Sequence, residues 1–237
     1  MMATSHMAKY GSNEEDLAAI AVKNHKNALD NPKAHIRKTI TKEDVLNSRP
    51  VASPLKLYDS SPISDGAAVA ILTKPELVRK FTDAPTYAVG MGHKSDTIGL
   101  YEREDICWPV AMVEACREAY GMAGIGPNEV SLAEVHDAFT INEVLAYEAA
   151  GFAERGQGHF LVRDGQMEIG GKVSVNPSGG LKARGHPVGA TGLCQLYEIH
   201  NQLIGTCGSR QVPRARHGLT INEGGSNAIV ATHIISN

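Results

Sequence analysis

Residues 176–192 read NPSGGLKARGHPVGATG, with five glycines among seventeen positions. Glycine loses more backbone entropy on ordering than other residues, so this cluster predicts tight turns or a close approach of a ligand to the backbone. The stretch leads into an apolar helix expected over residues 189–204. That helix would place free N–H groups and the positive end of its dipole near His186. The glycine spacing fits neither GxxxxGK[ST] nor the GxGxxG phosphate loop that follows a strand.

Two other segments lie where an expected strand ends and the next part of the chain begins. His136-Asp137-Ala138-Phe139 follows a strand expected over residues 130–135 and opens a helix expected over 139–150. Asn222-Glu223-Gly224-Gly225-Ser226 follows a strand expected over 218–222. A single histidine is more often structural than catalytic, but two at strand ends beside Gly-rich turns favour a site. Because α/β folds assemble their sites at strand ends, we expect these segments to meet in one pocket.

Strands and helices alternate from about residue 87 onward. We expect further strands over 67–72, 87–91 and 228–235, helices over 14–27, 42–46, 74–81 and 108–123, and a hairpin of 160–162 with 167–169. The run at 67–72 is apolar without polar alternation, which is typical of a strand buried on both faces. Together these elements predict a layered α/β domain.

Composition excludes several classes of protein. Hydrophobic residues make up 42% of the 237 residues and charged residues 21%, which is typical of a globular chain. A net charge of −3 and an aromatic content of 5% argue against a nucleic-acid surface. No apolar run approaches 18 residues, so we expect no membrane span. The four cysteines form no CxxC pair, which argues against a metal site or a disulfide scaffold and favours the reducing cytoplasm.

The Gly-rich stretch resembles a known family motif. Residues 179–192 match the thiolase pattern G-G-x-x-A-x-G-H-P-x-G-A-T-G, including both the glycine spacing and His186-Pro187. Residues 136–139 are similar to the HDCF motif of the sterol-carrier-protein-type thiolases, which replaces the NEAF of other thiolases. Ser64-Asp65-Gly66-Ala67-Ala68 resembles the strand that enters the centre of that fold. The chain is therefore similar to the C-terminal part of such a thiolase.

This resemblance implies the fold and its divisions. We expect an α/β, thiolase-like layered αβα fold that holds the C-terminal half and remnants of the loop domain and of the N-terminal half. The loop-domain-like segment would be residues 1–62, the last strand and helix of the N-terminal half 63–84, and the C-terminal thiolase domain 85–237. The thiolase part that carries the nucleophilic cysteine has no counterpart in these residues.

None of the cysteines offers a substitute nucleophile. Cys116 and Cys194 fall within expected apolar helices, Cys107 precedes a helix and Cys207 follows one. Buried cysteines of this kind act as small hydrophobic residues.

The resemblance also implies roles for individual residues. His186 would raise the thiolate fraction of the nucleophilic cysteine, and His136 would join it in holding a water or a donor toward the thioester oxygen. The N–H of Gly224 would serve a second oxyanion hole. The expected catalytic residues are thus His136, His186 and Gly224, and the expected substrate-binding residues are Gly180, Gly185, Ala138, Phe139 and Asn222. No metal or cofactor is implied, since acyl-CoA and CoA are substrates.

Two positions depart from the family pattern. Thiolases carry a second, acid–base cysteine in C-x-G-G-G or in HDCF, where this chain has Asn222 and Ala138. Neither side chain exchanges a proton near neutral pH as a thiol does. A retro-aldol cleavage, or an acid–base group from another segment, stays open.

The expected function follows from these points. We expect the C-terminal part or subunit of an acyl-CoA C-acyltransferase of lipid metabolism, which forms or cleaves carbon–carbon bonds once an N-terminal half or a nucleophile-bearing subunit joins it. The alternatives are a non-catalytic acyl-CoA-binding partner module and a retro-aldol carbon–carbon lyase. The apolar run at 67–72 favours a homo- or hetero-oligomer. A small zinc-ribbon/OB-fold protein is a further candidate partner, whereas no nucleic-acid or membrane partner is expected.

Overall fold

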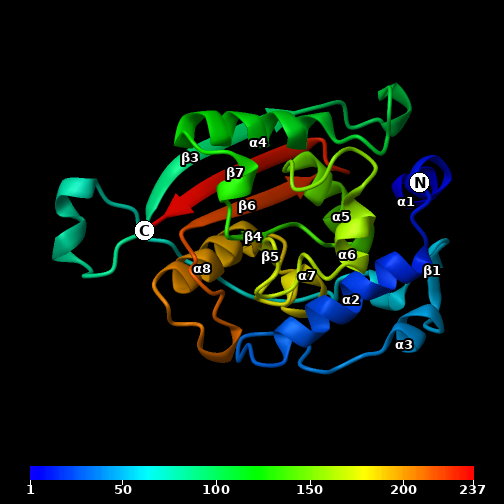
Figure 1. Ribbon diagram of the computed structural model, residues 1–237, viewed down its shortest axis with the longest axis horizontal. Coiled ribbons are helices and arrows are strands. Elements are labelled where there is room, and N and C mark those ends of the chain that lie inside the picture. The colour runs from blue at the N-terminus through cyan, green and yellow to red at the C-terminus, as the bar shows by residue number, and fades with distance from the viewer.

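A five-stranded mixed sheet forms the centre of the computed structural model, which describes residues 1–237 (Figure 1). Its strand order is β3-β7-β6-β4-β5. The strands are β3 (Tyr87–Ser95), β4 (Leu132–Glu134), β5 (Ser174–Val175), β6 (His217–Gly224) and β7 (Ile229–Ser236). β7 runs antiparallel to both β3 and β6, whereas β6, β4 and β5 run parallel. The carboxyl ends of β4 and β6 therefore meet at one edge of the sheet.

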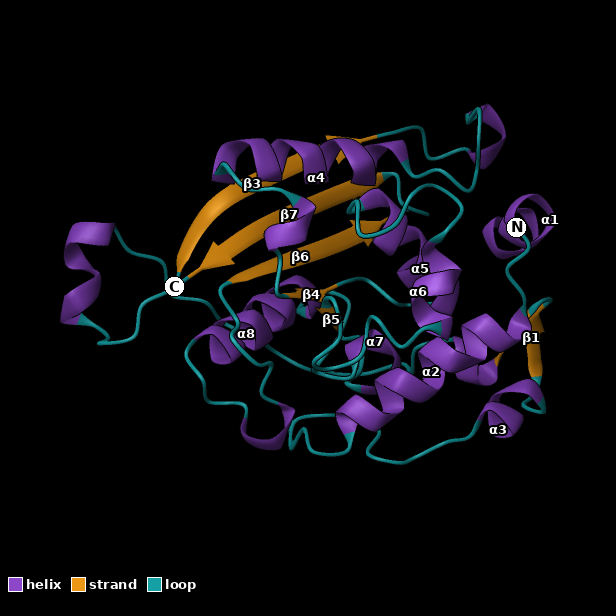
Figure 2. Cartoon of the chain, in the orientation of Figure 1, coloured by secondary structure: helices purple, strands orange, loops and turns teal.

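Helices cover both faces of this sheet, as Figures 1 and 2 show. On one face lie α4 (Val110–Ala123) and α5 (Thr140–Ala149), and on the other lies α8 (Thr191–Leu203). Side chains that alternate along the strands supply both cores. Leu219 belongs to the large cluster under α4 and α5, and Leu132 to the smaller cluster under α8. The layered α/β fold expected from the sequence is confirmed.

The first 60 residues wrap the side of this unit. They form α1 (Met2–Tyr10), α2 (Glu14–Ala28), α3 (Lys42–Leu46) and a small hairpin of β1 (Pro50–Ala52) with β2 (Leu55–Lys56). The Asn13 side chain caps α2 by accepting the N–H groups of Glu15 and Asp16. α2 then packs against α5 and two short helices, α6 (Gly158–Arg163) and α7 (Gly180–Ala183). Short 3-10 turns occupy Leu57–Asp59, Pro75–Lys80, Leu100–Glu102, Pro127–Glu129 and Gly208–Arg210.

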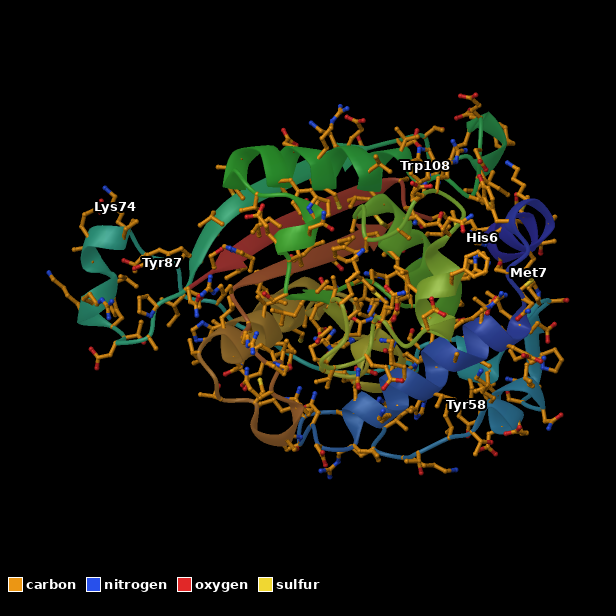
Figure 3. All side chains as sticks on the ribbon, viewed as in Figure 1. His6, Met7, Tyr58, Lys74, Tyr87 and Trp108 are labelled. Atoms are coloured by element: carbon orange, nitrogen blue, oxygen red, sulfur yellow. The ribbon has the colours of Figure 1, made fainter.

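A buried histidine fixes α1 to the body. Figure 3 shows His6 on the inner side of that helix, where it is fully buried. Its Nδ1 lies 2.7 Å from Oγ of Ser12 and its Nε2 3.0 Å from Oε1 of Glu148. The beginning of the chain is thus an integral part of the packed structure.

The hairpin predicted at 160–169 is wrong. Residues 158–163 form α6, and residues 167–169 are not a strand. The Asp164-Gly165 pair ends this helix instead: Gly165 has φ 65° and donates its N–H to the Val162 carbonyl. A glycine in the left-handed region suits a helix end as well as a hairpin turn, so the local signal fits both structures.

The strand predicted at 67–72 is also absent. This segment pairs with no other strand, and Val69, Ile71 and Leu72 are 83%, 85% and 88% exposed. A strand exists only where a neighbour accepts its hydrogen bonds, and these 237 residues provide none there. The following 3-10 turn, which begins just after the Lys74 labelled in Figure 3, projects from the body before the chain returns at Tyr87. No helix in the structure combines the length and the apolar character required to cross a bilayer.

Candidate active site

The two histidines singled out in the sequence lie edge to face. His136 follows β4, and His186 lies in the loop between α7 and α8. Their ring centroids are 4.9 Å apart, with an interplanar angle of 84°. The backbone of His186 also forms an isolated β-bridge with Ile63. The prediction that these histidines converge is confirmed. The single pocket expected for the three segments is not formed, because residues of 136–139 and 222–226 line one cavity and Gly185 and Pro187 line another.

Hydrogen bonds orient each imidazole. Nδ1 of His186 lies 2.7 Å from Oγ1 of Thr191, whose hydroxyl donates to the Pro187 carbonyl at 3.1 Å. Thr191 has one proton to donate, so it accepts the Nδ1–H of His186. In the same way, Oδ1 of Asn222 accepts the Nδ1–H of His136 at 2.8 Å. Both rings therefore carry their lone pair on Nε2.

Burial keeps this pair uncharged. It lowers the pKa of His136 to about 4, helped by the charges of His186 and Arg184 and opposed by the Asn222 hydrogen bond. Burial and the charge of Arg184 also lower the pKa of His186. At neutral pH both rings are neutral, and a neutral imidazole is the form that accepts a proton from a thiol.

The buried side chain of Asp137, next to His136 in the sequence, holds the loop that leads to His186. Asp137 accepts the N–H groups of Leu181 at 2.6 Å and Lys182 at 3.2 Å, and the side-chain amide of Asn24 at 2.7 Å. Gly180 lies against the same carboxylate with φ +60°, and a Cβ there would be 2.3 Å from Asp137 Oδ2. We assigned Asp137 no role from the sequence, although its position next to His136 in the 136–139 motif could have indicated one.

A cavity of about 370 Å³ opens beside His136. Ala138, Phe139 and Gly224 line it, as three of the predicted site residues. It also holds Asn142 and Glu223, which our sequence reasoning did not select. Asn142 donates its side-chain N–H to Oε1 of Glu223, while Oε2 is buried without a partner. Burial raises the pKa of Glu223 to about 8.

A larger cleft of about 680 Å³ lies along the extended segment at 63–69. Gly185 lines it together with Arg184, whose three guanidinium nitrogens are buried without hydrogen-bond partners. Gly180 lines neither of these cavities and lies against Asp137. The catalytic and binding roles assigned to the eight site residues stay predictions.

All four cysteines are free thiols. Cys107, Cys116 and Cys207 are buried, and burial raises the pKa of Cys116 and of Cys207 to about 12. Such thiols are protonated at neutral pH and are poor nucleophiles. Cys194 is partly exposed and lines the larger cleft.

Sequence comparisons relate the chain to known proteins. The family described as thiolase C-terminal domain-like matches residues 92–237. Curated relatives include the acetyl-CoA acetyltransferases of Methanothermobacter thermautotrophicus and Methanocaldococcus jannaschii, which are 49% identical over 236 residues and 42% over 243. Sterol carrier protein 2 of Oryctolagus cuniculus is 40% identical over 232 residues. These matches cover 100%, 100% and 96% of this chain but only 62%, 62% and 42% of the relatives.

Solved structures show the same architecture. The chain superimposes on the Ltp2–ChsH2(DUF35) aldolase with a TM-score of 0.90 and 27% identity, covering 100% of this chain and 62% of that one. A monomeric SCP2-thiolase-like protein type 1 from Mycobacterium smegmatis gives a TM-score of 0.74 at 20% identity, over 99% of this chain and 50% of that one. The second likeness shows the fold alone. Together the comparisons confirm the expected thiolase-like fold and family resemblance.

Proposed function

The chain belongs to the thiolase C-terminal domain-like family, and from that premise we propose that it is the C-terminal part or a subunit of an acyltransferase acting on acyl-CoA thioesters. Its nucleophilic cysteine would come from an N-terminal half or a partner subunit. The observation that carries the proposal is the neutral His136–His186 pair, in which both Nδ1 atoms are engaged and both Nε2 atoms keep a lone pair. The acetyl-CoA acetyltransferases among the relatives support the reaction class.

The acyl-transfer step follows from these protonation states. Nε2 of His186 takes the proton of the incoming cysteine thiol, and the thiolate attacks the thioester carbon. CoA leaves as a thiolate and regains that proton from His186, so the acyl group ends on the cysteine. Nε2 of His136 accepts a hydrogen bond from a water whose other hydrogen points to the thioester oxygen. Gly224 supplies a second donor from its backbone, and each oxyanion donor lowers the barrier by about 3 kcal/mol.

The proposed enzyme needs a nucleophile-bearing part that these 237 residues do not supply. The chain spans less than two thirds of its curated relatives, and its apolar segment at 67–72 lies open to solvent. An extended apolar surface of this kind favours association. We propose that the nucleophile-bearing half pairs with this segment, and that the completed subunits form an oligomer in the cytoplasm, in keeping with the free thiols.

A specific observation favours a second candidate reaction. Ala138 and Asn222 stand at the two positions where thiolases carry their acid–base thiol, and the Ltp2–ChsH2(DUF35) aldolase shares this fold at 27% identity. A retro-aldol cleavage of a β-hydroxyacyl-CoA is therefore the alternative. The same neighbour is named with a second protein, which supports a partner subunit in general, and we keep the zinc-ribbon/OB-fold protein as the candidate for it. A non-catalytic acyl-CoA-binding module is the remaining candidate.

The test is acyl transfer in the assembled enzyme. The chain is produced with the nucleophile-bearing half and incubated with acetyl-CoA, acetoacetyl-CoA or a β-hydroxyacyl-CoA, and intact mass spectrometry follows the cysteine adduct. We expect an acyl-cysteine that forms at least about 100-fold more slowly in His186→Gln. Lyase products from the β-hydroxyacyl-CoA alone would select the aldolase. Binding of acyl-CoA without an adduct or turnover would select the non-catalytic module.

A further inference from the structure

Any carbon–carbon chemistry at this site needs a group that gives and takes a proton at the substrate α-carbon. Ala138 and Asn222 lack a titrating group in the neutral range. His136 and His186 are committed to the thioester oxygen and the nucleophile in the proposed function, on which this inference rests. The reaction therefore requires a further titratable side chain in the same cavity.

Glu223 supplies a carboxyl group in this cavity. It belongs to the end of β6, between Asn222, which holds the His136 ring, and Gly224, the proposed oxyanion donor. Glu223 is one of the residues that line the 370 Å³ cavity, together with His136 and Ala138. The backbone nitrogen of Glu223 lies 3.4 Å from Nδ1 of His136, which places the residue beside that ring; the shorter Asn222 contact, at 2.8 Å, takes the ring proton. Glu223 thus lies in the cavity that also holds the Ala138 position of the missing thiol.

Only one of its carboxyl oxygens is engaged. The Asn142 side chain, from the first turn of α5, donates to Oε1 and fixes the orientation of the group. Oε2 is buried and has no hydrogen-bond partner. A buried polar atom without a partner is rare in folded proteins and calls for an explanation, such as a catalytic role.

The surroundings of the carboxyl favour its protonated form at neutral pH. Burial raises its pKa to about 8, while the Asn142 hydrogen bond and the Arg103 guanidinium oppose that shift. The other titratable side chain that lines the cavity is His136, on the β4 side, which is neutral. A carboxyl with this pKa is able both to donate and to accept a proton near neutral pH.

We propose that Glu223 is the acid–base residue of the carbon–carbon bond step, in place of the family's second cysteine. In the cleavage direction the nucleophilic cysteine takes the acyl group of a β-ketoacyl-CoA, and the carbon–carbon bond breaks to leave an acetyl-CoA enolate. Oε2–H of Glu223 protonates the enolate carbon, which gives acetyl-CoA and a Glu223 carboxylate. That carboxylate then takes the thiol proton of free CoA as its sulfur attacks the acyl-cysteine. In condensation the carboxylate removes the α-proton instead.

The experiment compares Glu223→Gln, Glu223→Asp and the exposed control Glu154→Gln in the chain assembled with its nucleophile-bearing half. Gln keeps the shape and the Asn142 contact but carries no exchangeable acid. We expect acyl-cysteine formation from acetyl-CoA to stay within about twofold of wild type, since it uses His186. The carbon–carbon step falls at least about 100-fold in Glu223→Gln, recovers partly in Glu223→Asp and is unchanged in Glu154→Gln. Wild-type carbon–carbon turnover in Glu223→Gln would overturn the proposal.

Two further readouts separate this inference from the function on which it rests. We expect the wild-type cleavage rate to fall above about pH 8, as Glu223 loses its proton, and we expect no such fall in Glu223→Gln. In the 237-residue chain alone, infrared spectroscopy detects a carboxylic acid band that titrates near pH 8 and is absent from Glu223→Gln. Absence of that titration in wild type overturns the Glu223 assignment while leaving acyl transfer intact. Absence of any acyl-cysteine in the wild-type assembly rejects the proposed function itself.

Discussion

A methyl group added at Gly180 tests whether Asp137 holds the catalytic loop. Gly180 has φ +60°, and its Cβ would lie 2.3 Å from Oδ2 of Asp137. A left-handed backbone costs alanine ~1–2 kcal/mol, and displacement of a packed side chain adds ~1–3 kcal/mol. We therefore expect Gly180→Ala to lower the free energy of unfolding by about 2–5 kcal/mol.

Gly165→Ala is the matched control. Gly165 has φ +65° at the end of α6, and no atom lies within 4 Å of a Cβ placed there. This variant carries the same backbone strain, of ~1–2 kcal/mol, without the contact. The loss of unfolded-chain entropy on replacing glycine is common to both variants and cancels in the comparison.

The assay is equilibrium urea unfolding followed by far-UV circular dichroism, with NMR of the histidine rings as a second readout. The ring signals of His136 and His186 should shift in Gly180→Ala and stay in place in Gly165→Ala. Equal destabilisation in the two variants would refute the contact between Gly180 and the Asp137 carboxylate. Unchanged ring signals in a destabilised Gly180→Ala would refute the role of that contact in placing the histidines.

Three more outcomes follow from burial and exposure. Burial lowers the pKa of His136 from about 6.5 in the unfolded chain to about 4, so between these values the unfolded state binds a proton that the folded state does not. The free energy of unfolding should therefore fall by about 3 kcal/mol between pH 7 and pH 4. Urea unfolding should show a shallower pH dependence in His136→Gln, and equal slopes in the two proteins contradict the assignment. Iodoacetamide at pH 7.5 should alkylate Cys194 while Cys116, with a pKa raised by burial to about 12, stays unmodified in the native chain, and the reverse order by peptide mass spectrometry contradicts the burial. The double change Ile71→Asp and Leu72→Asp should reduce self-association of the isolated chain in sedimentation velocity without lowering its thermal stability, because both side chains are more than four-fifths exposed; a monomeric wild-type chain would contradict association through this segment.

Local sequence signals determined most helices and the position of the histidines. The helices expected over 14–27 and 108–123 are α2 and α4; Asn13 caps the first, and Pro109 and Gly124 bound the second. The Gly-rich run leads into α8, and His136 lies two residues after the end of β4. These features were readable because each depends on residues within a few positions along the chain.

Tertiary structure decided the features that depend on distant partners. Residues 158–163 form a helix in place of the expected strand, and Arg163 in that helix pairs with Asp16, 147 residues away, which joins α6 to α2. The apolar run at 67–72 has the composition of a strand, but no strand of this chain lies beside it.

The environment of Glu223 is likewise a product of the fold. In the sequence Glu223 is one residue of a strand-end turn, with no sign that its carboxyl is buried. Packing of α5 against the end of β6 brings Asn142, 81 residues away, onto one of its oxygens and excludes water from the other. The residue type is written in the sequence, but its protonation depends on desolvation, which is a property of the assembled neighbours.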